Sequence, residues 1–228
     1  MTQVNRVVIL GGHGKVALLA TPKLVHAGFS VDSVIRNPAQ RGDIENTGGR
    51  PVILDMETAT VDQFVTLFDG ASAIVFSAGA GGGNPKRTHA VDYKAALRTM
   101  QAAEHAKVPR YVMVSYARVA EYCRKLDPGN SFYPYCKAKY DADAYLRRTS
   151  LDYTILGPGL LNLKPATKKF QMADDQGQVN GAWADNKKIS SRGNVAEAIV
   201  HVLLHQSGIC KTLNFYDGEM PLDQAFGG

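Results

Sequence analysis

The stretch Val7-Val8-Ile9-Leu10-Gly11-Gly12-His13-Gly14-Lys15-Val16-Ala17 joins an apolar run to a glycine-rich turn. Four consecutive apolar residues are typical of a strand that is buried on both faces, as in a parallel sheet covered by helices. A helical pattern follows over 15–27, and Gly28 stands where a helix commonly ends. Strand, tight turn and helix in this order predict the first unit of a doubly wound α/β domain.

Strands and helices alternate along the rest of the chain. The runs rich in β-forming residues cover 4–10, 31–35, 51–54, 72–76, 111–114, 153–156 and 212–215, and the helical stretches cover 15–27, 60–68, 89–106, 135–148 and 194–204. This alternation predicts a Rossmann-like parallel sheet of about seven strands with helices on both faces. Pro22 falls inside the first helix, where it is expected to kink the helix or replace a turn.

The sequence predicts one domain over residues 1–228, because the length suits a single α/β core and no linker separates two cores. The helix and strand patterns weaken between about 158 and 192. Residues that break the periodicity there are Pro158, Gly159, Pro165, Gly177 and Gly181. Since a long irregular stretch in a compact domain is usually functional, this segment is predicted to lie on the substrate side.

Composition narrows the classes of partner. The net charge of +5 and pI near 9.0 come from basic residues that are interleaved with acidic ones, so no nucleic-acid partner is expected. No stretch approaches the roughly 18 consecutive apolar residues of a membrane span, and no apolar signal core follows Met1. We therefore expect a cytoplasmic protein without membrane contact, either a monomer or a small homo-oligomer, that acts on a small molecule.

Metal and hydrolase chemistry are not indicated. The three cysteines, at 123, 136 and 210, are widely spaced and form no metal-binding motif or disulfide framework. His201 and His205 are four apart, but the glutamate of a metalloprotease helix and a third ligand are both missing. Ser115 has no glycine two positions away on either side, so the hydrolase nucleophile elbow is absent.

The glycine-rich turn predicts a dinucleotide site. Gly11 and Gly12 permit the tight turn, and Gly14 lets the backbone approach a pyrophosphate. The start of the helix, at Lys15 and Val16, offers unpaired N–H groups and a positive dipole end to the phosphates. His13 either lines the phosphates or serves only the turn conformation. The alternative to the whole site is a strand-to-helix turn that binds nothing.

Arg36 lies 22 residues beyond Gly14, just after the second predicted strand, where dinucleotide-binding proteins read the adenosine ribose. NAD-binding proteins usually carry an acid there, whereas an arginine accommodates the 2′-phosphate of NADP. Asp32 lies inside the strand, too early to be that acid. The sequence therefore predicts NADP, with NAD as the less favoured cofactor and a solvated surface arginine as the alternative reading of Arg36.

Two further strand ends fall on the same edge of the predicted sheet. The third strand is followed by Asp55 and Met56, and Asp55 is placed to accept a hydrogen bond from the adenine amine. The fourth is followed by Ser77-Ala78-Gly79, small residues that let the cofactor lie against bare backbone. The alternatives are a helix cap for Asp55 and a flexible loop for the small residues.

A catalytic set is predicted beside this edge. Ser115 ends the fifth strand, and Tyr135 and Lys139 are four apart, so they share a face if one helix includes both. The ammonium of Lys139 would lower the pKa of the phenol and also hydrogen-bond the nicotinamide ribose. Tyr135 could then pass a proton to a carbonyl oxygen that Ser115 orients. Tyr133, Tyr140 and Lys137 compete for these roles, and an amphipathic helix with packed tyrosines is the alternative.

Taken together, these segments resemble the atypical short-chain dehydrogenase/reductases, in their NmrA-like NAD(P)H-binding branch with flavin and biliverdin reductases. The segments that carry the resemblance are GGHGKVA, VIRNP, LDM, SAGAGGG, HAVDYKAALRTMQAAEHAKVPRYVMVS, YCKAKYDADAYLRRTSLDYTILGPG and ISSRGNVAEAIVHVLL. The resemblance implies strand order 3-2-1-4-5-6, usually with a seventh strand, and NADP more often than NAD. Tyr135, Lys139 and Ser115 fit the serine and Tyr-x-x-x-Lys pattern of the wider family.

The chain departs from the branch at two positions. Ala17 replaces the third fingerprint glycine, and Gly157 stands where the branch commonly has an arginine before Pro158. The leading hypothesis is an NADPH-dependent oxidoreductase that passes hydride to a quinone, flavin or carbonyl compound. One alternative is an NADP(H)-sensing regulatory protein without turnover, because the branch includes redox sensors. The other is an NAD-dependent epimerase/dehydratase-like enzyme, which the short C-terminal part of about 70 residues disfavours.

Overall fold

The structure is a computed structural model that describes residues 5–80, 83–181 and 188–227. Its strands are β1 Arg6–Leu10, β2 Ser30–Ile35, β3 Arg50–Ile53, β4 Ala73–Phe76, β5 Arg110–Val114, β6 Asp152–Pro158, β7 Leu160–Asn162, β8 Lys169–Ala173, β9 Ile189–Ser191, β10 Lys211–Asp217 and β11 Met220–Pro221. Its helices are α1 Lys15–His26, α2 Arg41–Glu45, α3 Val61–Phe68, α4 Pro85–Thr88, α5 Ala96–His105, α6 Val119–Lys125, α7 Tyr133–Leu146, α8 Arg192–Leu204 and α9 Leu222–Phe226, with a 3₁₀ turn η1 Pro38–Gln40 and a π-helix η2 His89–Ala95.

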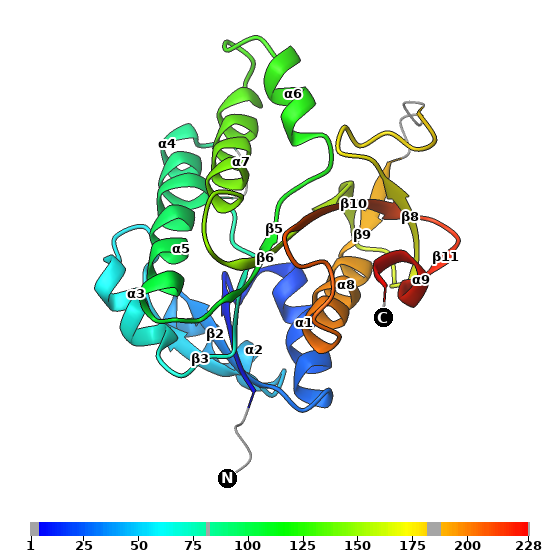
Figure 1. The fold of residues 1–228 in the computed structure, drawn as a ribbon. Coiled ribbons are helices and arrows are strands. Elements are labelled where there is room, and N and C mark those ends of the chain that lie inside the picture. Colours follow the sequence, from blue (N-terminus) through cyan, green and yellow to red (C-terminus); the bar gives the residue numbers. More distant parts are fainter. Residues whose placement is uncertain (1–4, 81–82, 182–187, 228) are drawn as a thin grey trace.

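The main sheet has the order β11-β8-β10-β6-β5-β4-β1-β2-β3 (Figure 1). From β3 to β10 every neighbouring pair is parallel, which confirms the doubly wound fold and the order 3-2-1-4-5-6 with a seventh strand. All seven predicted strands are present within a residue or two of their expected bounds, although residue 4 lies outside the described residues. Within the described ranges, no helix is long and apolar enough to cross a membrane.

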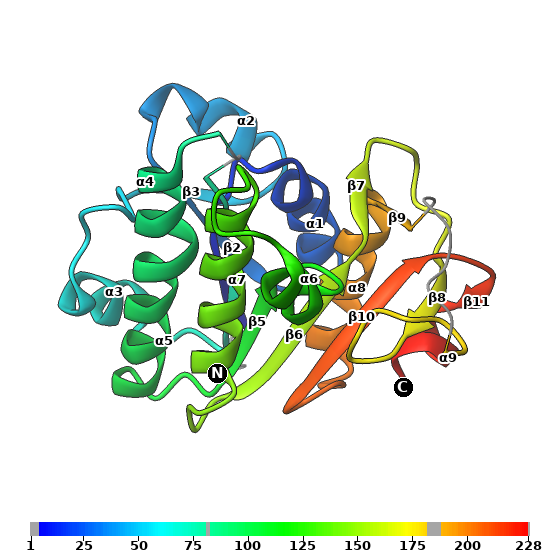
Figure 2. The ribbon, with the colours of Figure 1, turned by 90° about the horizontal axis from the view of Figure 1, so that it is seen from above.

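Helices cover both faces of the sheet. Figure 2 shows α3, α4, α5 and α7 on one side and α1 and α8 on the other. Successive residues of a strand point to opposite faces, so Val8 and Leu10 of β1 join the core under α3 and α5, while Val7 and Ile9 join the core under α1 and α8. This double burial is why β1 is continuously apolar.

Helix α1 runs unbroken through Pro22, so the expected loss of a turn does not occur. Proline removes one backbone donor, and the neighbouring Thr21 hydroxyl donates to the carbonyl of Ala17 over 2.9 Å. Ala20 and Leu24 are fully buried in the core shared with α8. Packing of this face therefore stabilises the helix against the local cost of proline.

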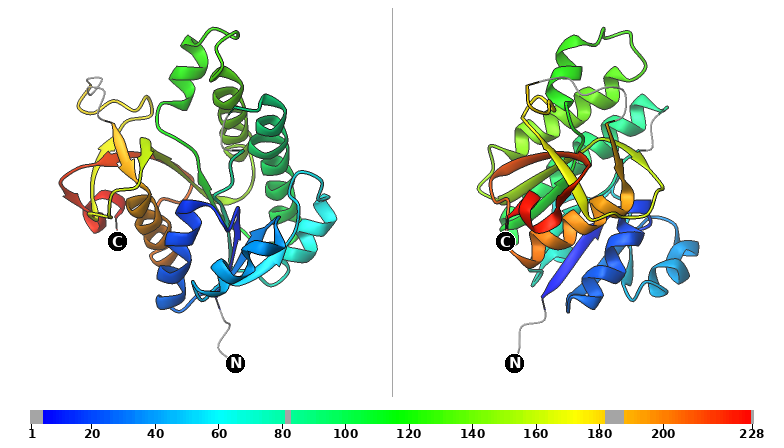
Figure 3. Two further views of the ribbon diagram at one scale, coloured as in Figure 1. Left: turned by 180° about the vertical axis from the view of Figure 1, so that it is seen from behind. Right: turned by 90° about the vertical axis from the view of Figure 1, so that its right-hand side faces the viewer.

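Residues 158–192 contain more regular structure than the sequence indicates. β7 and β9 pair in parallel as a small second sheet, and β8 adds an antiparallel strand beside β10. Of the five residues of β8 only Phe170 is buried, in edge-to-face contact with Phe215 and Phe226, so the strand leaves almost no apolar pattern. Figure 3 shows β8, β10 and α9 gathered at this edge of the sheet.

Candidate functional site

The turn between β1 and α1 lies directly against the ends of two neighbouring strands. A side chain on Gly11 would place its Cβ 2.7 Å from Ala78 Cα, and Gly11 also has a φ of +81°. A Cβ on Gly12 would lie 2.6 Å from Ser33 Cβ. Because real side-chain atoms do not approach so closely, these two glycines are required by packing, and they hold the start of α1 at the carboxyl edge of the sheet.

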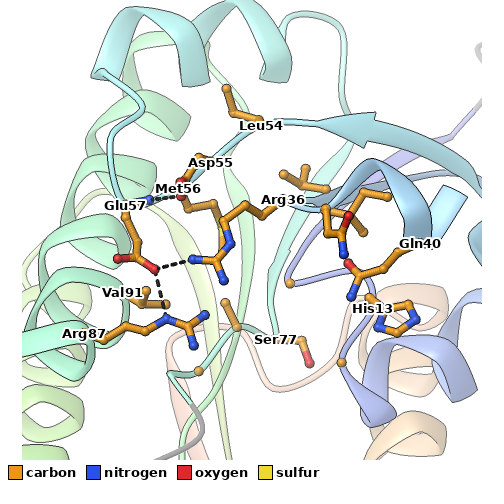
Figure 4. Close-up of a pocket in the computed structure, with 17 residues that line it drawn as sticks. His13, Arg36, Gln40, Leu54, Asp55, Met56, Glu57, Ser77, Arg87 and Val91 are labelled. Carbon is orange, nitrogen blue, oxygen red and sulfur yellow. Dashed lines mark hydrogen bonds and ion pairs between the residues drawn. The ribbon is translucent and has the colours of Figure 1, made fainter. Parts of the chain in front are cut away.

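A cavity of about 380 Å³ opens over this turn (Figure 4). The predicted cofactor residues that line it are Gly11, His13, Gly14, Arg36, Asp55, Met56, Ser77, Ala78 and Gly79. Gly12 is buried beneath the turn against Ser33, whereas Lys15 and Val16 line a second cavity next to this one. The structure thus brings together residues from the ends of β1, β2, β3 and β4, at the edge where open α/β sheets bind ligands.

Arg36 belongs to an ion-pair cluster that sequence reasoning did not reveal. Its Nη1 lies 2.9 Å from Glu57 Oε1, and Nε of Arg87 lies 2.9 Å from the same oxygen. Figure 4 shows both guanidiniums directed toward Glu57 at one end of the cavity. Asp55 and Glu57 line the same cavity, so the formal charges of its lining cancel. Arg36 and Arg87 nevertheless bring two guanidiniums to one place, and such a pair suits an anion such as a phosphate.

Two other predicted residues have local partners. Asp55 Oδ1 accepts a hydrogen bond from the backbone N–H of Glu57 over 2.9 Å, which forms a turn after β3. His13 Nε2 lies 2.7 Å from Asp43 Oδ2 on α2. These contacts fix both side chains beside the cavity.

A second cavity of about 1260 Å³ shares Gly14, Ser77 and Gly79 with the first, so the two cavities adjoin at these residues. Ser115 and Tyr135 line it, whereas Tyr133 and Tyr140 do not. Figure 1 shows α6 and α7 on one side of this region and the segment around β8 and β9 on the other. Its size exceeds the 300–1,000 Å³ typical of a ligand pocket, which leaves room for half of a dinucleotide together with a second small molecule.

Lys139 lies under the junction of the two cavities. Its side chain is 3% exposed, with Nζ 3.2 Å from the carbonyl oxygen of Val114 and 3.3 Å from Asp92 Oδ1. Asp92 belongs to the π-helix η2, and its other carboxylate oxygen accepts the backbone N–H of Ala80 over 2.9 Å. Lys137 instead pairs with Asp141 on the exposed side of α7 over 2.6 Å. Of the two candidate lysines, only Lys139 reaches the ends of β4 and β5, at the carbonyls of Ala78 and Val114, and it lines neither cavity.

The pKa of Tyr135 moves in the opposite direction from the expected one. Burial raises the pKa of the phenol, and the charge of Lys139 lowers it by less. The pKa of Lys139 is itself lowered by burial but raised by more through Asp92, Tyr135 and Asp143, so the amine stays protonated. Tyr135 is therefore a neutral phenol at pH 7, which is the form that donates a proton.

Ser115 is tied to an acid. Its Oγ donates to Asp143 Oδ2 over 2.6 Å, and both side chains are buried. Burial raises the pKa of Asp143 to about 6, against the opposing effects of the Ser115 hydrogen bond and of Arg147 and Lys139. Tyr135, Lys139 and Asp143 follow one another at spacings of four on α7, so a spacing rule extended one step beyond Lys139 would have found Asp143.

Gly157 stands where the related branch commonly has an arginine, and the structure gives a reason for this difference. A Cβ at this position would lie 2.1 Å from Asn214 Oδ1 on the neighbouring strand β10. Asn214 is held in place because its amide donates to the carbonyl of Asp174 over 2.8 Å. An arginine therefore does not fit at position 157.

Among the residues that the structure describes, no three His, Cys, Asp or Glu side chains cluster as a metal site.

The sequence matches known proteins over almost its whole length. The model of the NAD(P)H-binding family matches residues 11–206. UPF0659 protein C216.03 of Schizosaccharomyces pombe is 32% identical, and the match covers 97% of this chain and 93% of that protein.

Solved structures have the same fold. A putative NAD-dependent epimerase/dehydratase of Bacillus halodurans superposes with a TM-score of 0.82 at 29% identity, over 95% of this chain and 96% of its own. The oxidoreductase ylbE of Lactococcus lactis superposes with a TM-score of 0.79 at 25% identity, over 96% and 94% of the two chains. The family match confirms the resemblance to the NAD(P)H-binding branch, and the chain belongs to the NAD(P)H-binding family, with a nicotinamide dinucleotide as its cofactor.

Proposed function

We propose that this protein is an NADPH-dependent oxidoreductase that transfers hydride to a small acceptor, such as a quinone, a flavin or a carbonyl compound. One observation carries the proposal. The large cavity lined by Ser115 and Tyr135 opens from the glycine turn through Gly14, Ser77 and Gly79. A bound dinucleotide that follows this path has its adenosine half in the small cavity and its nicotinamide half beside a proton donor.

The residues of the small cavity fit a dinucleotide. Gly14 lines both cavities and carries no side chain, so its backbone is open to a ligand. The start of α1 then presents its N–H groups and positive dipole end to a pyrophosphate. Ser77, Ala78 and Gly79 give the second wall of this path without bulky side chains.

Arg36 and Arg87 support a preference for NADPH. Both reach one end of the small cavity, and they share a single carboxylate, Glu57. NADH has a 2′-hydroxyl at this position, which gains little from two guanidiniums, whereas the 2′-phosphate of NADPH can pair with both. The pair of guanidiniums therefore favours the phosphorylated cofactor.

A side chain of the large cavity, Tyr135, can protonate a reduced acceptor. The cofactor supplies hydride when it is bound. Tyr135 holds its phenolic proton at pH 7 and faces the cavity, so it can donate that proton to the oxygen that gains charge. Lys139 stays charged under the site and stabilises the phenolate that the transfer leaves behind.

The experiment that tests this function is NADPH oxidation with a panel of quinones, flavins and carbonyl compounds. We expect at least one acceptor to be reduced with turnover, faster with NADPH than with NADH. Tight NADPH binding with no oxidation by any acceptor of the panel would contradict the proposal and would support the cofactor-sensing alternative instead.

A further inference from the structure

We propose that Cys123 and Cys136 form a redox-modification site, in which a disulfide oxidant joins their Sγ atoms and the new bond links α6 to α7. The inference goes beyond the proposed function, because it concerns a reaction of the protein's own thiols and its test needs no turnover. Two features of the structure support it. They are the contact between the two thiols and the place of the segment that they enclose.

The two cysteines lie on neighbouring helices that pack against each other (Figure 1). Cys136 Sγ donates to the carbonyl oxygen of Val119 on α6 over 3.5 Å. Val119 is four residues before Cys123, and in an α-helix such a carbonyl also accepts the amide of the residue four positions later. The thiol of Cys136 therefore reaches α6 at the turn that carries Cys123.

The two thiols also share a hydrogen bond. Burial raises the pKa of both thiols, and the hydrogen bond acts in opposite directions, lowering the pKa of Cys123 and raising that of Cys136. Cys136 is therefore the donor and Cys123 the acceptor. A disulfide needs two sulfur atoms about 2.0 Å apart, and thiols already in hydrogen-bond contact reach this distance by small side-chain rotations.

The contacts of Cys136 suit the oxidised state as well as the reduced one. The hydroxyl of Tyr116 lies 2.9 Å from Cys136 Sγ, and it can donate to a disulfide sulfur as well as to a thiol. The carbonyl of Val119 would lose the hydrogen bond from the thiol, but it keeps its place in the backbone ladder of α6. The surroundings of the pair therefore accommodate a disulfide without rearrangement of the helices.

The segment enclosed by the two cysteines forms one wall of the large cavity. The residues of this segment that line the cavity are 128–132, Pro134 and Tyr135. A bond between Cys123 and Cys136 would close the segment into a ring and restrict the local opening of α6. Oxidation of the pair would thus act directly on the wall that carries the proposed proton donor.

The reaction balances with a small disulfide, such as oxidised glutathione, as the oxidant. Cys136 is buried and Cys123 only partly so; the thiolate of Cys123 attacks one sulfur of the oxidant, forms a mixed disulfide and releases one glutathione thiolate. Cys136 then gives its proton to solvent, and its thiolate attacks Cys123 Sγ and releases the second glutathione thiolate. The protein loses two electrons and two protons, and the oxidant is reduced to two molecules of glutathione.

The test treats the reduced protein with oxidised glutathione at about pH 8, because a thiol whose pKa is raised needs alkaline conditions to ionise. Free thiols are then blocked, and the protein is digested with trypsin without reductant. Trypsin separates the two cysteines into peptides 119–124 and 126–137. We expect mass spectrometry to find these peptides as one species, about 2 Da lighter than the two reduced peptides together, and dithiothreitol to separate them.

Cys210→Ser is the matched control, because Cys210 is exposed and lies directly before β10, outside both helices. This variant should form the link at a rate within about twofold of the wild type, whereas Cys123→Ser should leave Cys136 unlinked. Two results in the wild type would overturn the inference whether or not the variants fold. They are a mixed disulfide at Cys123 that never resolves to Cys136, and absence of the linked peptides after oxidation.

Limited digestion of the folded protein with trypsin measures the constraint on the cavity wall. Cleavage after Arg124 and Lys125, which are exposed on α6, should be at least about threefold slower in the oxidised protein than in the reduced protein. Cleavage after Arg41, exposed on α2, is the internal control and should be unchanged. Equal cleavage at α6 in the two states would contradict a restraint on this wall.

Discussion

Ser115 Oγ donates its only proton to Asp143 Oδ2 over 2.6 Å. While Asp143 is ionised, the hydroxyl therefore presents lone pairs alone to the cavity and cannot donate to an acceptor's carbonyl oxygen. Once Asp143 is protonated, the carboxyl can donate to Ser115, and the serine proton becomes available to the acceptor. The protonation state of Asp143 thus decides whether Ser115 can donate a hydrogen bond to the acceptor.

The first prediction concerns Asp143→Asn. Because the pKa of Asp143 is raised to about 6, the ability of wild-type Ser115 to donate to a carbonyl acceptor is expected to decline as pH rises through about 6. The neighbouring charged groups that act on Asp143 are Arg147 and Lys139, and the raised pKa of Lys139 keeps its amine protonated over this range. The variant should lack the decline in kcat/KM, measured between about pH 5 and pH 8. Asp141→Asn, two residues away on the outer side of α7, is the control, and an unchanged inflection in Asp143→Asn would contradict this role.

Asp32 gives a prediction about stability, because its pKa is lowered whereas that of Asp143 is raised. Burial raises its pKa, but hydrogen bonds and charge from Arg50 and Arg6 lower it by more, so the folded state favours the carboxylate. The resulting stability is present above the unfolded pKa near 3.8 and is lost as pH falls through the lower folded value. Asp32→Asn should reduce the free energy of unfolding by about 2–3 kcal/mol at pH 7 in urea titrations. A loss of the same size at pH 3, where the wild-type advantage should already have decreased, would argue against this ion-pair cluster.

Tyr135→Phe tests the proton donor. With a carbonyl acceptor we expect kcat to fall by about 100-fold or more, since general acid catalysis contributes at least that much. The affinity for NADPH should stay within about twofold, because the phenol does not line the adenosine cavity. Tyr140→Phe on the same helix is the control, as its ring is outside the cavity lining. Full activity of Tyr135→Phe on such an acceptor would reject the assigned role, whereas a flavin acceptor need not depend on it.

The sheet and the glycine turn could be predicted because their signals are local. Strand β1 is apolar at every position from Val7 to Leu10, since both of its faces are buried. The turn needs Gly11 for its φ of +81° and Gly12 for its contact with Ser33 of the next strand. β8 could not be predicted, because a strand with one buried residue, Phe170, has no apolar pattern.

The ion pairs at the site could not be predicted, because they join residues that are far apart in the sequence and meet only in the folded protein. Arg87 lies 51 residues beyond Arg36, and the two meet only through Glu57. Asp92 reaches Lys139 from the π-helix, 47 residues earlier in the chain. Neither pairing has a motif, so the sequence located the cofactor edge but not the groups that determine its charge.

The most direct test of the account is the affinity of the protein for NADPH and NADH, measured by fluorescence titration in the wild type, Arg36→Ala and Arg87→Ala, with Lys86→Ala as the exposed control next to Arg87. The account predicts that the wild type prefers NADPH by about tenfold or more. Each arginine variant should lose about 1.5–3 kcal/mol of NADPH binding, or 10- to 100-fold, with little change for NADH. Equal losses for both cofactors, or no preference in the wild type, would contradict it.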